Sequence, residues 1–118
     1  MHSDFAVSAT CVRVPVLRSH SESITITFEN DVDVNVDTVR EVLGNFENVV
    51  VMDDMSKNEY PMPKTATDTD DTYVGRIRKD LFANNMLHLW GVADQVRVGA
   101  ATNSVRIAQK WIKLEENA

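Results

Sequence analysis

The feature that most constrains the fold is a strict alternation of apolar and hydroxyl side chains in residues 23–28. Ile24, Ile26 and Phe28 point to one face of a strand, and the hydroxyl groups point to the other. The chain also contains seventeen valines, and β-branched residues favour strands because their stiff side chains pack well on a pleated surface. The sequence therefore predicts a sheet that turns one face toward a core.

Shorter patterns predict further strands. Residues 7–16 alternate in the same way and predict a strand with Arg13 on its outer face. The polar residues 18–22 then form a short connection to the next strand. The apolar run at 49–52 predicts a strand that is covered on both faces.

Residues 73–79 and 86–92 predict a β-hairpin. We expect its turn at Asn84 and Asn85, because asparagine tolerates the left-handed backbone that a tight turn requires. The stretch 56–72 contains two of the three prolines and several acids without apolar periodicity, so it is expected to be a surface loop.

Two segments have the apolar spacing of helices. One begins near Asp37, whose carboxylate can accept bonds from free helix amides, and ends near Phe46. The other, residues 98–114, is apolar around most of its circumference and requires cover on more than one side. These elements predict an α+β fold with a mostly antiparallel or mixed sheet and two main helices.

The size and charge of the chain limit its organisation and partners. Its 118 residues make room for one domain, and a net charge of -6 has the wrong sign for a nucleic-acid-binding protein. The single cysteine excludes an internal disulfide and fits a reducing compartment. We expect no membrane segment or signal peptide and a cytoplasmic location, because no apolar run approaches about 18 residues.

Arg13 and His20 are the candidate pair for chemistry, on the polar side of a strand and its exit turn. An arginine fork binds a carboxylate through two parallel bonds, and histidine exchanges a proton near neutral pH. The pair suits an acidic substrate. The spacing alone equally fits a surface arginine and a loop histidine without function, and this alternative is the more frequent one.

Other reactive residue types have simpler interpretations. Cys11 is expected to be an inert, buried residue within its strand. His88 interrupts an apolar run and is expected to be half-buried and hydrogen-bonded; no second histidine lies at metal spacing, so no metal is proposed. Arg76 and Arg78 are expected on one strand face, paired with the acids at 68–71.

Three segments carry a family resemblance: TCVRVPVLRSHSESI at 10–24, DTYVGRIRKD at 71–80 and GAATNSVRIAQ at 99–109. In this order they closely resemble the C-terminal part of aspartate-semialdehyde dehydrogenase, and the likeness covers nearly the whole chain. The resemblance implies a catalytic and dimerisation domain with a sheet similar to that of the C-terminal domain of glyceraldehyde-3-phosphate dehydrogenase.

The resemblance also implies an activity and roles for three residues. In that family a cysteine attacks the aldehyde, a hydride passes to NADP, and phosphate releases the acyl enzyme as aspartyl phosphate; biosynthesis of lysine, threonine and methionine uses the reverse direction. Arg13 corresponds to the arginine that binds the substrate carboxylate, and His20 to the acid/base histidine. Asn103 corresponds to a residue beside the nicotinamide end of NADP.

The chain departs from the family pattern in what it lacks. It contains no Gly-rich nucleotide turn, and Cys11 does not match the nucleophilic cysteine. Residues 1–118 are therefore expected to form a single partial domain of a homo-oligomer, inactive alone, whose helix at 98–114 packs on a missing N-terminal nucleotide-binding half. The alternative is a non-catalytic α+β regulatory or interaction module.

Overall fold

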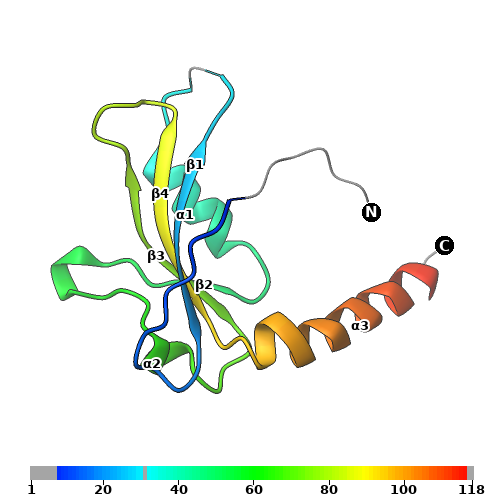
Figure 1. Cartoon of the computed structure of the whole chain (residues 1–118). Helices are drawn as coiled ribbons and strands as arrows, with labels where there is room; N and C mark the ends of the chain where they lie inside the picture. The colour runs from blue at the N-terminus through cyan, green and yellow to red at the C-terminus, as the bar shows by residue number, and fades with distance from the viewer. Residues whose placement is uncertain (1–7, 31, 117–118) are drawn as a thin grey trace.

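The computed structural model describes residues 8–30 and 32–116 and has the expected α+β architecture. In chain order the elements in Figure 1 are β1 (His20–Thr27), α1 (Val36–Gly44), β2 (Val49–Val51), the 3₁₀ turn η1 (Met55–Lys57), α2 (Pro63–Ala66), β3 (Thr72–Lys79), β4 (Met86–Ala93), the π-helical turn η2 (Arg97–Ala101) and α3 (Thr102–Glu116). The predicted hairpin and both main helices are thus confirmed.

The strands form one mixed sheet in the order β1-β4-β3-β2. β4 is antiparallel to both β1 and β3, whereas the short strand β2 is parallel to β3. Because β1 and β4 run in opposite directions, the start of β1 lies beside the end of β4, and His20 pairs with Ala93. Residues 73 positions apart in sequence therefore meet at one end of the sheet.

Helix α1 covers one face of the sheet and completes the core. The buried core residues are Val34, Val74, Ile77, Leu87 and Leu89. The helix begins at a cap different from the expected one: the side chain of Asn35, not of Asp37, accepts bonds from the amides of Asp37 and Thr38. Asparagine is as good a cap as aspartate, so the acid at the second helical position misled the prediction.

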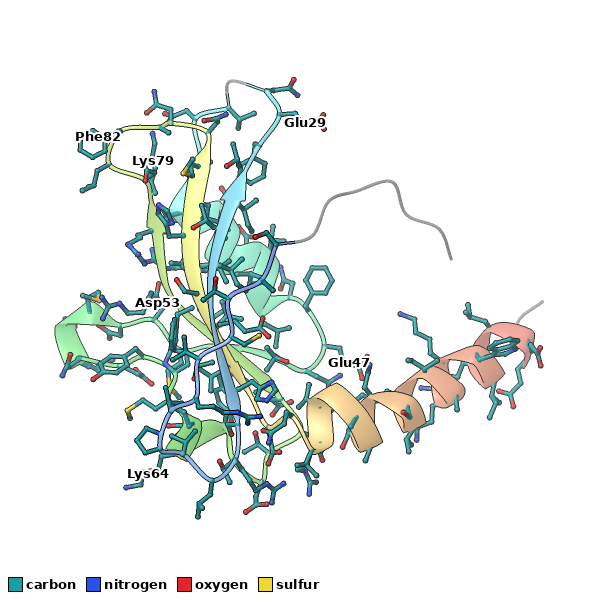
Figure 2. All side chains as sticks on the ribbon, viewed as in Figure 1. Glu29, Glu47, Asp53, Lys64, Lys79 and Phe82 are labelled. Carbon is teal, nitrogen blue, oxygen red and sulfur yellow. The ribbon has the colours of Figure 1, made fainter. Side chains whose placement is uncertain are left out.

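The loop that contains α2 covers part of the opposite face. Val92 is 1% exposed, and Pro61 and Ala66 are also buried. This loop lies so close to β3 that a β-carbon at Gly75 would be 2.1 Å from the Met52 carbonyl oxygen, so only glycine fits there. Figure 2 shows Lys64, on α2, at one end of the sheet and Phe82, in the turn between β3 and β4, at the other end.

Two predictions about the backbone are wrong. Residues 8–19 form no strand, and Val12 is 74% exposed; the apolar alternation is present, but this segment has no strand partner among the described residues. Residue 7 lies outside the described range. The turn of the hairpin does not depend on a left-handed Asn84 or Asn85, because Asp80 accepts bonds from the amides of the two residues at 82 and 83.

Helix α3 leaves the sheet and extends away from it (Figure 1). It contains no buried residue, and Trp111 and Leu114 are 64% and 65% exposed. Arg106 anchors its first turns through a 2.7 Å bond to the side chain of Asn48. Within the part of the chain that the structure describes, no helix is long and apolar enough to cross a membrane.

Candidate functional site

The segment that carries Arg13 runs along the surface before β1. Residues 8–17 are all exposed, and the Arg13 side chain makes no hydrogen bond or ion pair with the residues that the structure describes. The Val16 amide donates to the Val14 carbonyl at 2.8 Å, which bends the chain at Pro15. The guanidinium of Arg13 is therefore available to a carboxylate from outside the chain.

A buried serine sets the direction in which the chain enters β1. Ser19 is 5% exposed and has a φ of 79°, which is uncommon for a residue with a β-carbon. Its amide donates to Gln95 Oε1 at 2.6 Å, and its hydroxyl lies 2.9 Å from Thr67 Oγ1. These bonds tie the turn to the exit of β4 and to the end of α2, so β1 starts from a fixed position.

His20 follows this turn as the first residue of β1. Its imidazole is exposed and has no hydrogen bond or ion pair within residues 8–30 and 32–116. The structure therefore does not join His20 to Arg13 by a direct contact. With both ring nitrogens open, His20 can exchange a proton with a bound molecule.

Asp94, at the end of β4, is a charged group with 0% exposure. Its Oδ2 forms a 2.6 Å ion pair with Arg18 and accepts a 2.8 Å bond from the Asp68 amide, while its Oδ1 accepts from the Val96 amide at 3.0 Å. Burial opposes ionisation of this carboxyl, but the amide bonds and Arg18 outweigh it and lower its pKa.

A second carboxylate fixes the start of α3. Asp70 accepts two parallel 2.8 Å bonds from Arg97 and a 2.7 Å bond from the Thr102 hydroxyl. Arg97, and after it Thr102, lower the pKa of Asp70 to about 2. Asn103 follows on the first turn of α3 with an exposed side chain. π-Helical turns such as η2 occur frequently at functional sites.

The fold brings two of the three predicted site residues to one end of the sheet. His20 pairs with Ala93, and the chain continues from there through Asp94 and η2 to Asn103. Arg13 lies in the segment that leads into the same turn. The exposed side chains of His20 and Asn103 thus lie next to segments that are held by the ion pairs of Asp94 and Asp70.

The other reactive side chains have different surroundings. Cys11 is exposed, which corrects the expectation of a buried thiol, because no strand forms around it. The expectation for His88 is confirmed: its ring bonds to Asp80 at 2.8 Å and to Thr25 at 3.0 Å. Among the described residues, no three His, Cys, Asp or Glu side chains are grouped to hold a metal ion.

A groove of about 400 Å³ lies on the open face of the sheet, which is the face opposite α1 that the α2 loop covers only in part. Its lining includes Arg76, Arg78, Tyr60 and Trp90. A bulge in β3 gives Arg76 a φ of 55°, and its guanidinium lies over the Tyr60 ring, 5.9 Å from the centroid. The expected pairing with the acids at 68–71 is wrong, because Asp68 pairs with Arg18 and Asp70 pairs with Arg97.

The family described as "Semialdehyde dehydrogenase, dimerisation domain" matches residues 1–98. The chain belongs to this semialdehyde dehydrogenase family. Aspartate-semialdehyde dehydrogenases from Campylobacter jejuni and Bacillus subtilis are 57% and 46% identical to it, over 98% and 94% of the chain. The chain spans only 33% and 32% of the length of these two proteins and corresponds to the C-terminal portion of such dehydrogenases.

A solved structure supports the same assignment to the semialdehyde dehydrogenases. The crystal structure of aspartate semialdehyde dehydrogenase II from Vibrio cholerae, complexed with ASA, matches with a TM-score of 0.79 and 32% identity. The matched region covers 88% of this chain and 30% of the Vibrio chain. The alternative of an unrelated regulatory or interaction module is not favoured.

Sequence reasoning missed the framework of this candidate site. Asp94 has one local signal, since an acid between a strand and a helix is typical of a helix cap. Ser19 and the Asp70–Arg97 pair have none, because their partners lie far away in sequence.

Proposed function

We propose that this chain contributes the substrate-binding and acid/base residues of an aspartate-semialdehyde dehydrogenase. The reaction is the NADP-dependent reductive dephosphorylation of aspartyl phosphate to aspartate semialdehyde, in the cytoplasmic biosynthesis of lysine, threonine and methionine. One observation carries the proposal: Arg13 and His20 are exposed and lack partners among the described residues, although they flank a rigid turn. Both residues lie in the segment 10–24 that carries the family resemblance, so a bound substrate would be the partner that the described residues do not supply.

Arg13 would bind the carboxylate of the substrate. Its planar guanidinium can donate two parallel bonds to a carboxylate, which fixes the orientation of the bound molecule as well as its charge. The bend at Pro15 and the bonds of Ser19 restrict the segment on one side of it. Lysine would supply only a point charge at this position.

His20 would act as the acid/base residue: its imidazole would take a proton from the bound substrate at one step of the reaction and return it at another. Such transfer by a positioned side chain contributes about 10²–10⁴-fold to a rate. The main chain of His20 is held against Ala93 in the sheet, while its ring is open to the solvent. The site thus combines a fixed backbone with a free imidazole.

The start of α3 fits the nicotinamide end of NADP. A β-carbon at Gly99 would meet nothing within 4 Å, and the Asn103 amide is exposed. An amide can both donate to and accept from a carboxamide. When bound, NADPH supplies the hydride for reduction. Asn103 would orient the ring end, and the other parts of the cofactor would be held outside this chain.

The exposed helix α3 would pack on a nucleotide-binding domain. Its apolar side chains are uncovered on more than one side, including Ile107 at 59% and Ile112 at 56% exposure. Contiguous apolar surface of this kind marks an interface. We expect the chain alone to be inactive, because its sequence contains neither a Gly-rich phosphate turn nor a matching nucleophilic cysteine.

The enzyme would be a homo-oligomer that associates through the open face of the sheet. The groove there combines Trp90 and Tyr60 with two arginines, residue types that are enriched in interface centres. Trp90→Glu should weaken self-association in sedimentation experiments, because it would place a charge in this centre. Unchanged association would contradict this choice of surface.

A chimera tests the proposed reaction. In it, this chain replaces the matching portion of the Campylobacter jejuni enzyme, which is 57% identical. His20→Ala should lower kcat by about a hundredfold or more with little change in the Kd of NADP. Arg13→Lys should instead lower kcat/KM for the semialdehyde by about 30-fold or more, mainly through KM. A folded wild-type chimera without turnover would refute the proposal.

A further inference from the structure

We propose that Asp94 is a positioning residue that holds His20 and Asn103 in a fixed relation to each other. The inference rests on the proposed function, since it concerns the same site. Asp94 touches neither substrate nor cofactor in that proposal. Its carboxylate is nevertheless fully buried, and burying a charge is costly unless it is paired and hydrogen-bonded.

One side of the Asp94 carboxylate restrains the segment before His20. Its Oδ2 pairs with Arg18 at 2.6 Å, and Arg18 also pairs with Asp68 at 2.5 Å. The next residue along, Ser19, is bonded to Gln95, the neighbour of Asp94. The main chain that leads into His20 therefore depends on the position of Asp94.

The other side of Asp94 starts the turn that leads to Asn103. Its Oδ1 accepts from the Val96 amide, and its carbonyl accepts from the amides of Arg97 and Val98 at 3.1 and 2.8 Å. These bonds set the first turn of η2, from which α3 continues. A shift of Asp94 would thus move the acid/base residue and the cofactor residue relative to each other.

Such a shift should affect turnover more than folding. A displacement of about 1 Å in a catalytic group can cost about a hundredfold in rate. Asp94→Asn keeps the size of the side chain and one acceptor oxygen for Val96, but it removes the charge that Arg18 requires. We expect kcat to fall about tenfold to a hundredfold.

The experiment measures kcat, both KM values and the pH profile of kcat for the chimera defined above. Asp54→Asn is the matched control, because Asp54 also accepts from two amides and pairs with a cation, Lys57, but lies on the distant η1 turn. Asp94→Asn should lower kcat and change the pH profile of kcat. The control should leave kcat within about twofold of wild type.

The Arg18–Asp94 pair gives a second test. Arg18→Gln removes the cation and leaves the amide bonds of Asp94 intact, and the double variant should be no worse than Asp94→Asn alone. If Asp94→Asn does not fold, Arg18→Gln is measured in its place. A wild-type chimera without turnover would refute the proposed function itself. An active chimera whose Asp94→Asn variant keeps kcat and the pH profile would overturn only the positioning role.

Discussion

Two regions at the same end of the molecule differ in how their side chains are satisfied. Around Asp94, one fully buried carboxylate is paired with Arg18 and accepts bonds from two backbone amides, and of the buried side-chain polar atoms in the described residues only Arg18 Nε has no partner. Along α3, apolar groups are exposed and no residue is buried. The first region is completed within this chain, whereas the second requires a surface from outside it. The difference distinguishes the part of the chain that is stabilised by its own contacts from the part whose apolar surface requires a partner.

The physical costs explain why the two regions differ. A buried charge without partners destabilises a fold strongly, so the Asp94 cluster must be formed by the chain itself. Exposed apolar surface costs about 25 cal/mol per Å² relative to burial, and a later contact can recover this free energy. The pattern is therefore expected of a portion of a larger protein.

The largest effect should come from truncating a side chain in the hydrophobic core, which, like the Asp94 cluster, is covered within this chain. Leu87→Ala should lower the free energy of unfolding by about 3 kcal/mol, because Leu87 is 2% exposed and its removal leaves a cavity. Leu114→Ala on α3, where Leu114 is 65% exposed, should cost less than about 0.5 kcal/mol. Urea unfolding of the 118-residue chain measures both. Equal losses would contradict the division into two regions.

Gly75→Ala should give a smaller loss of about 2 kcal/mol, since the added methyl overlaps the Met52 carbonyl and the Pro61 ring. Gly99→Ala is the control, because nothing lies within 4 Å of its β-carbon. The control should change stability by less than about 1 kcal/mol, in the favourable direction. An unaffected Gly75→Ala variant in the same urea titrations would show that the loop does not lie against β3.

Polar substitutions on α3 should change association more than folding. The pair Ile107→Ser and Trp111→Ser should weaken self-association of the isolated chain by about tenfold, because it removes apolar surface from the uncovered helix. Phe82→Ser, at an equally isolated tip with 96% exposure, is the matched control and should have little effect. Sedimentation at several concentrations distinguishes them. Equal effects would mean that α3 is not a specific contact surface.

The smallest effect concerns pH and the anchor of α3. The pKa of Asp70 is lowered from 3.8 to about 2, so an unfolded chain binds a proton there at higher pH than the folded one. The stability from the Arg97 pair is therefore complete above about pH 3.8 and is lost as the pH falls toward 2. Asp70→Asn should flatten the dependence of Tm on pH over this range. An equally steep curve in the variant would contradict the assignment.

Local patterns predicted the elements that local forces determine. The alternation at 23–27, the hairpin segments and the apolar spacing of both helices fall on elements of the expected type, but Ile26 and Phe28, which were expected to face the core, are each 37% exposed. The same alternation forms no strand at 8–16, because it indicates two faces and says nothing about a neighbouring strand. The bulge at Arg76 also has no sequence signature, since only pairing with β4 creates it.

The site was less predictable than the fold. Arg13 and His20 were proposed from their chemistry, and a family resemblance in short local motifs then implied roles for them and for Asn103. The bonds that place them join residues distant in sequence, such as Ser19 with Gln95 and Asp70 with Arg97. Such pairs depend on the register of β1 against β4, which no local pattern specifies.

Hydrogen exchange tests the central comparison most directly. Amides of β3 and β4 should exchange slowly both in the isolated chain and in the chimera, because each of these two strands is paired with a strand on both of its edges. Amides of α3 should exchange rapidly in the isolated chain and at least about tenfold more slowly in the chimera, where the helix gains a surface to pack on. Equal protection of α3 in both proteins would contradict the account.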